Sequence, residues 1–336
     1  MIKNRPQIIV MTPVRNEAWI LRAFLKATSC WADYIIIADQ MSTDGSREIA
    51  KEFPKVVLID NDNREMHQAA TRQLLFKEVQ NVILKSKFSS SDFILFALDA
   101  DEFLCGDFIH TEGWNRILSS KPGECFFWRW MNLQPDCQTY TISNAYYWAV
   151  HMDETLWSGM FPDNFIHEWR LPWPKECTNS IVIEDLCSLH FARVNVKRQC
   201  NKVRFYEMST MTKKINESGV RMYRMYHEKE RGLEEKIIPK DAYIFYERLG
   251  IDIIALVNKE DEGEYYLQEC RRMLNENECS IYKKLDIWSE DFCEITGVQN
   301  PQTLIDRMMH CYLRITNPIH KNIIIRIIDK VLKKIY

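Results

Sequence analysis

The sequence lacks several features that would place the protein in a special class. No eighteen consecutive apolar residues occur in the 336-residue chain, so no transmembrane helix is predicted. Eleven cysteines are scattered without a CxxC pair or a Cys/His ladder, which argues against a disulfide framework and a zinc module. The formal net charge of −3 provides no basic field for a nucleic-acid partner. We therefore expect a cytoplasmic protein with reduced thiols that does not bind nucleic acid.

The first hundred residues alternate between strand-like apolar runs and helical patterns. We predict strands at Gln7 to Thr12, Tyr34 to Asp39, Val56 to Asp60 and Phe93 to Leu98. We predict helices at Ala18 to Ser29, Ser46 to Phe53 and Met66 to Lys87. This alternation is typical of a parallel sheet built from βαβ units. The chain is longer than one hydrophobic core usually supports, so a second domain or a long extension is also expected.

The last of these strands runs directly into the carboxylates Asp99, Asp101 and Glu102. On an extended backbone Asp99 and Asp101 point the same way, because side chains two residues apart share a face. Paired carboxylate oxygens suit Mg²⁺ or Mn²⁺, which keep coordination positions open for phosphates. A solvated acidic turn after a strand is the alternative interpretation.

The later part of the chain changes character twice. Residues Glu124 to Ile183 are rich in aromatic residues and interrupted by prolines, which predicts short strands and loops that continue the sheet. After His190 the segments are polar and helical in spacing. The end, KNIIIRIIDKVLKKIY, forms a basic amphipathic helix over residues 321–336, which either docks on its own protein or contacts a membrane surface.

Four motifs follow the four predicted strands in order: TPVRNE, ADQMSTDGS, HQAATRQ and LDADE. Together they resemble the family 2 glycosyltransferases of the GT-A fold, as found in lipopolysaccharide and capsule synthesis, over roughly Ile8 to Tyr206. The resemblance implies an α/β GT-A nucleotide-sugar-binding fold, with a mostly parallel central sheet flanked by helices. The implied glycosyltransferase domain covers residues 1–206, with a nucleotide-sugar half at about 1–105 and an acceptor half at about 106–206. Residues 207–336 would form a helical C-terminal extension.

The resemblance also implies roles for individual residues. A divalent cation, Mg²⁺ or Mn²⁺, would be held by Asp101 and His190 with Asp99 nearby; a purely structural His190 is the alternative. The partners would be a nucleotide-sugar donor and the hydroxyl of a glycan or lipid-linked acceptor, with inversion at the anomeric carbon. The donor would be bound by Pro13, Asn16, Glu17, Asp39, Arg72, Asp99 and Arg193.

The transfer needs a general base, because the acceptor hydroxyl loses its proton as the new bond forms. Glu168, in FIHEWR, is the candidate, and Asp185, in VIEDL, is its competitor.

Two other classes of function are alternatives to a glycosyltransferase. A nucleotidyltransferase of sugar-phosphate metabolism also holds a cation at a sheet edge, but PVRNEAW contains no glycine for a phosphate loop. A catalytically inactive, membrane-associated glycan-assembly protein would not need Asp99, Asp101, Glu168 and His190 together.

Overall fold

The computed structural model describes residues 5–64, 68–85, 92–156, 170–214, 217–227, 233–257 and 262–336. The chain folds into two compact units. The first comprises Met1–Val194 with Lys236–Lys259, and the second comprises Asn195–Glu235 with Glu260–Tyr336. The boundary expected between residues 206 and 207 lies inside α5 (Val196–Lys213), a helix of the second unit. The first unit therefore ends before α5 and later takes up a second segment of the chain.

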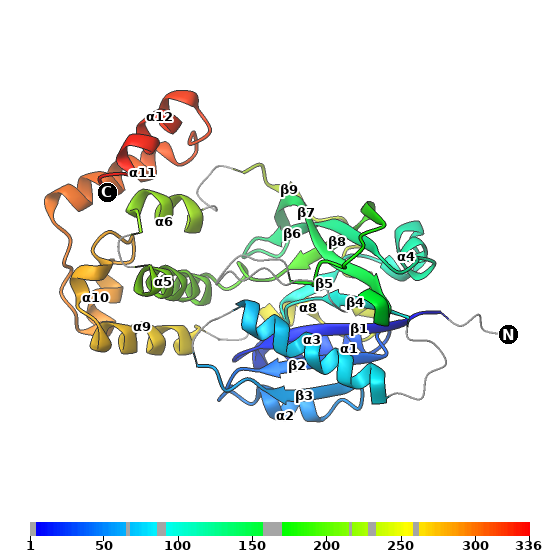
Figure 1. The fold of residues 1–336 in the computed structure, drawn as a ribbon. Coiled ribbons are helices and arrows are strands. Elements are labelled where there is room, and N and C mark those ends of the chain that lie inside the picture. Colours follow the sequence, from blue (N-terminus) through cyan, green and yellow to red (C-terminus); the bar gives the residue numbers. More distant parts are fainter. Residues whose placement is uncertain are drawn as a thin grey trace. The chain divides into compact units, whose positions relative to one another are not determined.

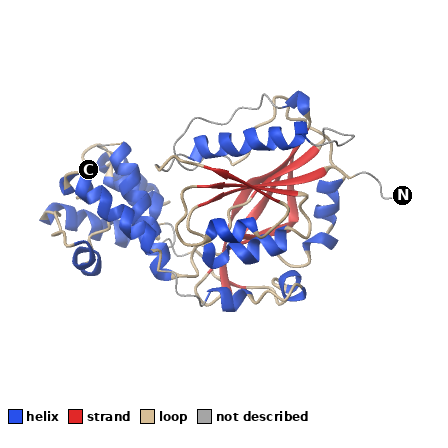
Figure 2. Ribbon diagram, turned by 90° about the horizontal axis from the view of Figure 1, so that it is seen from below, coloured by secondary structure: helices blue, strands red, loops and turns tan. Residues whose placement is uncertain are grey.

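The first unit is built on one sheet with the strand order β3-β2-β1-β4-β7-β6-β8-β5 (Figure 1). Strands β1 (Gln7–Val14), β2 (Tyr34–Asp39), β3 (Val56–Asp60) and β4 (Phe93–Ala97) run parallel to one another. They alternate with the helices α1 (Ala18–Thr28), α2 (Ser46–Lys51) and α3 (Gln68–Lys85). Figure 2 shows the strands as a twisted layer between helices. The predicted α/β architecture is confirmed.

The other half of the sheet is mainly antiparallel. It contains β5 (Glu102–Leu104), β6 (Glu124–Leu133), β7 (Thr139–Met152), β8 (Asn179–His190) and β9 (Lys236–Ile237). Strand β7 runs antiparallel to β4, β6 and β9, while β6 and β8 run parallel. The prediction of short strands in this region was wrong. Irregular register steps in β6 allow long strands to bend and stay paired.

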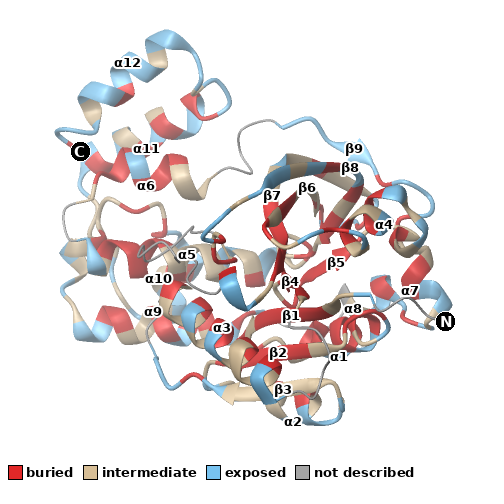
Figure 3. Ribbon diagram, turned by 45° about the vertical axis from the view of Figure 1, so that its right-hand side comes forward, coloured by how far each residue is buried: buried red, intermediate tan, exposed pale blue. Residues whose placement is uncertain are grey.

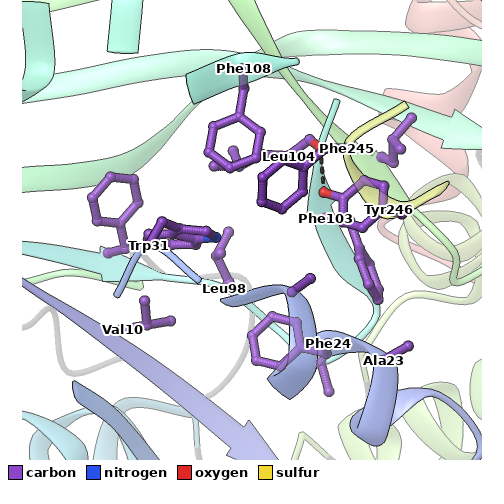
Figure 4. Close-up of a cluster of buried hydrophobic side chains, with 14 of the residues drawn as sticks. Val10, Ala23, Phe24, Trp31, Leu98, Phe103, Leu104, Phe108, Phe245 and Tyr246 are labelled. Carbon is purple, nitrogen blue, oxygen red and sulfur yellow. Dashed lines mark hydrogen bonds between the residues drawn. The ribbon is translucent and has the colours of Figure 1, made fainter. Parts of the chain in front are cut away.

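A hydrophobic core beneath the sheet explains why residues 236–259 belong to the first unit. Phe245 and Tyr246 of α7 (Ile244–Arg248) are buried, and their rings lie 4.9 Å from Phe108 and 5.2 Å from Phe103 respectively, between ring centroids. The Tyr246 hydroxyl donates a hydrogen bond to the Leu104 carbonyl oxygen (Figure 4). Close to this core lie η1 (Phe108–His110) and α4 (Glu112–Leu118); η2 (Glu154–Leu156) and α8 (Ile253–Val257) complete the described elements of this unit.

The second unit is helical. It contains α5, α6 (Gly219–Tyr226), α9 (Glu264–Glu276), η4 (Cys279–Tyr282), α10 (Glu290–Thr296), α11 (Leu304–Thr316) and α12 (Ile323–Leu332). The predicted helical C-terminal part is confirmed. Among the described helices, none combines the length and the apolar character needed to cross a membrane.

Candidate active site

The loops that follow β1 and β2 are joined to each other by hydrogen bonds. The Asn16 side-chain oxygen accepts a bond from the Thr43 amide at 2.7 Å, and the Asn16 amide donates to the Ser42 hydroxyl at 2.9 Å. Asp44 accepts a bond from the Ala18 amide at 2.9 Å. Asn16 has a φ of 54°, a left-handed conformation that asparagine adopts more easily than most residues. The NE and STDGS motifs therefore build one surface from two strand ends.

Asp39, at the end of β2, is buried beneath this surface and is 1% exposed. Its Oδ2 accepts bonds from Arg47 at 2.8 Å and from the Ser42 amide at 3.2 Å. Its Oδ1 is buried and has no hydrogen-bond partner among the described residues. A buried carboxylate oxygen without a donor is costly, so this atom is suited to an N–H or O–H donor of a ligand.

Pro13 and Glu17 flank this region. Pro13 lies within β1 opposite Ala38 of β2. Glu17 accepts a bond from the Trp19 indole nitrogen at 2.8 Å, and its amide donates to the Ser46 hydroxyl at 2.9 Å. Both residues thus belong to the wall formed by the two loops.

The segment after β4 is a turn, so the extended geometry expected for Asp99 and Asp101 was wrong. The Glu102 amide donates to the Asp99 carbonyl oxygen at 3.0 Å, which closes a four-residue turn. The Glu102 side chain accepts a bond from the Asp99 amide at 2.8 Å and reinforces it. As a result, Asp99 and Asp101 have different partners.

Asp99 contacts two arginines. Arg72 of α3 lies 3.2 Å from Asp99 Oδ1, and Arg170 lies 2.9 Å from Oδ2. Arg72 is 5% exposed, and its Nη1 has no hydrogen-bond partner among the described residues. Arg170 also pairs with Glu102, and its guanidinium lies 5.1 Å from the centroid of the Trp130 ring. The turn therefore holds two partly desolvated cations beside the carboxylates.

Glu102 is fully buried in the centre of this group. Its Oε1 accepts a bond from the Trp130 indole nitrogen at 3.0 Å, while Oε2 accepts from Arg170 and the Asp99 amide. Burial, opposed by the charge of Arg170 and assisted by that of Asp99, raises the pKa of Glu102 to about 7. Burial alone would lower the pKa of Arg170, but the charges of Asp99 and Glu102 outweigh it and raise this pKa.

Asp101 and His190 face each other across the β5–β8 strand pair. Asp101 Oδ2 lies 3.9 Å from His190 Nε2, and His190 Nδ1 lies 2.8 Å from the Asn132 side-chain oxygen. With that oxygen as acceptor, Nδ1 donates the hydrogen bond and Nε2 is the ring nitrogen that lies near Asp101. One carboxylate oxygen and one imidazole nitrogen at this separation are compatible with a shared divalent cation such as Mn²⁺.

Ligand atoms of Asp101, Glu102 and His190 lie within 4.8 Å of one another. Both Glu102 oxygens already accept hydrogen bonds, and both Asp99 oxygens contact arginines. Asp101 and His190 are therefore the better pair of candidate ligands.

The structure gives contacts for two of the remaining predicted residues, Asp185 and Arg193. Asp185 accepts a bond from the Gly113 amide at 2.9 Å in the first turn of α4, and it lies five residues before His190 on β8. Five residues of strand span roughly 16 Å, so Asp185 lies well away from the cation pair. Arg193 donates to the Thr141 hydroxyl at 3.3 Å. Glu168 lies outside the described residues.

The sequence reasoning missed Arg170 and Asn132 and assigned no role to Glu102. Arg170 ends the FIHEWR motif and Glu102 directly follows the DxD motif, so both could have been predicted from these motifs. Asn132 had no such signal, because only the pairing of β6 with β8 places it opposite His190.

Comparisons with known proteins agree with this geometry over the first part of the chain. Residues 9–109 match the model of glycosyl transferase family 2. The comparison with curated proteins finds no match. A solved structure of 4-diphosphocytidyl-2C-methyl-D-erythritol synthase is similar over 30% of this chain, at 12% identity and a TM-score of 0.23. The match spans about half of that structure, 48%, and a score this low supports no conclusion about this chain.

The matched segment contains β1 to β4, the two joined loops and the turn that carries Asp99 and Asp101. This part of the chain is a family 2 glycosyltransferase domain of the GT-A type.

Proposed function

We propose that the protein transfers a sugar from a nucleotide-sugar donor to an acceptor hydroxyl, with a divalent cation and with inversion at the anomeric carbon. The observation that carries the proposal is the gathering of Asp101, His190 and two arginines at the end of β4, beside the joined loops of β1 and β2. Open α/β sheets bind their ligands at this edge.

The donor would lie along the ends of β1, β2 and β4. Asp39 Oδ1 would accept a hydrogen bond from the nucleobase or ribose, and Arg72 Nη1 would donate to an oxygen of the ribose or phosphates. Asp101 and His190 would hold the cation, which supplies positive charge where the leaving diphosphate becomes more negative. Arg193 would contribute a further positive charge.

We assign the general base to Glu168. In this scheme its carboxylate takes the proton of the acceptor hydroxyl while the hydroxyl oxygen bonds to the anomeric carbon. The bond from that carbon to the phosphate oxygen breaks, and its electron pair leaves with the diphosphate. The position of Asp185 beside α4 supports this choice between the two carboxylates. We expect Glu168→Gln to lower turnover about a hundredfold, and Asp185→Asn to leave it nearly unchanged.

The acceptor class and the location of the reaction belong to the same proposal. We place the enzyme in the cytoplasm and assign it a glycan or lipid-linked acceptor of the cell envelope. The basis of this assignment is the resemblance of the sequence motifs to enzymes of lipopolysaccharide and capsule synthesis.

A thermal-shift titration with nucleoside diphosphates tests the donor and metal sites together. A ligand at a hundredfold excess over its Kd stabilises the folded protein by about 2.7 kcal/mol, so the matching nucleotide gives the largest shift. We expect the shift to require Mn²⁺ or Mg²⁺ and to lose its metal-dependent part in Asp101→Ala. Asp62→Ala, which changes an exposed carboxylate, is the control. Equal nucleotide affinity of the parent protein in Mn²⁺ and in chelator would exclude the metal role.

A further inference from the structure

The C-terminal helices α11 and α12 and the turn between them expose a large set of apolar side chains. We call this set the C-terminal apolar face, and each member is at least 37% exposed. Its members are Leu304, Ile305, Met308, Ile315, Ile319, Ile323, Ile324, Ile327, Ile328, Val331 and Ile335. Figure 3 shows most of α12 in the colour of exposed residues. Soluble proteins rarely expose so many large apolar side chains together unless the surface binds something.

Helix α12 packs on its own unit through its polar side. Asp329 is 6% exposed and pairs with Arg224 of α6 at 3.0 Å, and it accepts a bond from the Tyr312 hydroxyl at 2.9 Å. Ile327 and Val331 lie two residues before and after Asp329, a rotation of about 200° around the helix, and both are exposed. In this orientation most isoleucines of α12 are exposed, whereas Ile325 is half-buried and Leu332 packs against the apolar cluster that contains Leu313.

Helix α11 shows the same reversed arrangement. Its buried positions include the polar residues Asp306, His310 and Thr316. His310 Nδ1 lies 2.9 Å from Asp286, and Asp306 closes a capping box with Thr303. The apolar residues Leu304, Ile305, Met308 and Ile315 are exposed. Both helices therefore bury polar side chains in specific contacts and expose most of their apolar ones, although Leu313 of α11 is also buried.

The charges around the C-terminal apolar face indicate what covers it. Residues 304–336, all of which the structure describes, contain seven Lys or Arg, and each is exposed. The two acidic residues of this segment, Asp306 and Asp329, are buried at 4% and 6% exposure. Arg314 pairs with Asp286, and a second copy of the chain would bring the six other positive charges against six of the same sign, which disfavours a symmetric dimer through this face. A partner that presents anionic groups over an apolar layer would match both the exposed basic side chains and the exposed apolar side chains.

We propose that the C-terminal apolar face docks on the surface of a membrane that contains anionic lipids. The apolar side chains would enter the boundary between headgroups and acyl chains, and the basic side chains would contact lipid phosphates. Helix α12 has ten residues, so it lies in the interface and does not span the bilayer. The proposal goes beyond the C-terminal helix expected from the sequence, because α11 contributes to the same face. It does not depend on the proposed glycosyl transfer.

Vesicle co-sedimentation of the full chain tests the proposal. The vesicles contain phosphatidylcholine alone or with phosphatidylglycerol, at low and high salt. The apolar variant combines Ile324→Ser, Ile327→Ser and Val331→Ser, and the charge variant combines Lys330→Gln, Lys333→Gln and Lys334→Gln. The matched control combines Val182→Ser and Ile237→Ser, exposed apolar residues of the first unit at 50% and 83%. Thermal melting checks that every variant is folded.

We expect the parent and the matched control to bind anionic vesicles equally. The apolar variant should bind about tenfold more weakly or worse, and the charge variant should lose the salt-sensitive part of binding. Equal binding of parent and apolar variant, or no binding of the parent at low salt, would overturn the proposal. Sedimentation velocity without lipid gives a further check. A parent dimer that the apolar variant abolishes would assign the face to a second copy instead.

Discussion

Both units contain buried arginines that pair with carboxylates, and the surroundings of Arg224 in the second unit differ from those of Arg72 and Arg170 in the first. Arg224 of the second unit donates to Asp329, Thr316, Asn317 and the Leu313 carbonyl oxygen, with donor–acceptor distances from 2.6 to 3.3 Å. These bonds occupy its guanidinium with one carboxylate and neutral oxygens.

Arg72 and Arg170 of the first unit instead share a group of carboxylates. Asp99 lies between the two arginines and is about a third exposed, 32% at its side chain. Arg72 Nη1 has no partner among the described residues. Under the proposed function, this contrast separates an arginine that serves the fold, Arg224, from arginines that also bind a ligand, Arg72 and Arg170. Every N–H group of Arg224 donates a hydrogen bond within the fold. Arg72 keeps a donor, Nη1, that another molecule can use.

The largest expected effect is on stability, in the second unit. Arg224→Leu removes the charge partner of buried Asp329 and every hydrogen bond that the guanidinium donates, so we expect a loss of about 3–5 kcal/mol in the free energy of unfolding. Urea unfolding measures this change. Arg221→Leu is the control, because Arg221 is on the same helix, is exposed and pairs with Glu217 at 3.3 Å. Its effect should stay below about 1 kcal/mol. If the two variants lose similar amounts of unfolding free energy, burial does not make Arg224 more important for stability than an exposed arginine.

The second expected effect is on ligand binding, in the first unit. Arg170→Met leaves Asp99 paired with Arg72, and leaves Glu102 with bonds from Trp130 and the Asp99 amide, so stability should fall less than in Arg224→Leu. Loss of one positive charge should weaken binding of a nucleoside diphosphate by about tenfold to a hundredfold. Binding of Mn²⁺ alone should not weaken, because the site becomes more negative. Calorimetric titrations of both ligands check this, and weaker Mn²⁺ binding would contradict it.

A third test extends the comparison to acid stability. Asp286 contacts His310 at 2.9 Å and Arg314 at 2.7 Å. Burial tends to raise the pKa of Asp286, but the hydrogen bonds from these two side chains outweigh burial and lower the pKa to about 2. The folded pKa lies below the unfolded one, so the stabilisation is complete above about pH 4 and is lost as the pH falls toward 2. The contribution is about 2 kcal/mol. Urea unfolding at pH 5 and pH 3 measures this contribution. The difference in the free energy of unfolding between the parent and Asp286→Asn should be smaller at pH 3 than at pH 5. A difference that does not change with pH would argue against the ion pair.

The smallest expected effect concerns the orientation of His190. Asn132→Leu removes the acceptor of the Nδ1 proton, and loss of such a supporting hydrogen bond lowers metal affinity by about tenfold or somewhat more. Asn132→Asp keeps an acceptor at the same place and should retain Mn²⁺ binding. If leucine and aspartate weaken binding equally, the hydrogen bond does not position the imidazole.

The parallel half of the fold could be predicted closely from the sequence, and the antiparallel half could not. A strand buried on both faces gives an uninterrupted apolar run, and β2 has the bounds expected from such a run. The edge strand β3 also has the bounds expected for it. The pairing of β5 with β8 joins Glu102 to His190, residues far apart in the sequence, and no local pattern reports such a contact.

The candidate site follows the same division. Asp39, Arg72 and Asp101 are recognised from motifs, because each follows or faces a parallel strand end. Asn132 and Arg170 enter the site from segments that only the antiparallel pairing brings there. The turn at Asp99 was expected only as the alternative to an extended backbone, because its closing bond depends on the Glu102 amide rather than on an apolar pattern.

The bonds between the β1 and β2 loops have a thermodynamic consequence for donor binding. The Asn16 side chain of the β1 loop bonds to the backbone of the β2 loop, and the Asp44 carboxylate of the β2 loop bonds to the backbone at Ala18. The two loops are therefore held in place before a nucleotide binds. A binding site that needs no loop ordering loses little conformational entropy when its ligand binds. The same bonds couple the two loops, so substitutions at Asn16 and Asp44 should be non-additive. The affinity for the nucleotide is therefore a joint property of two segments that are distant in the sequence.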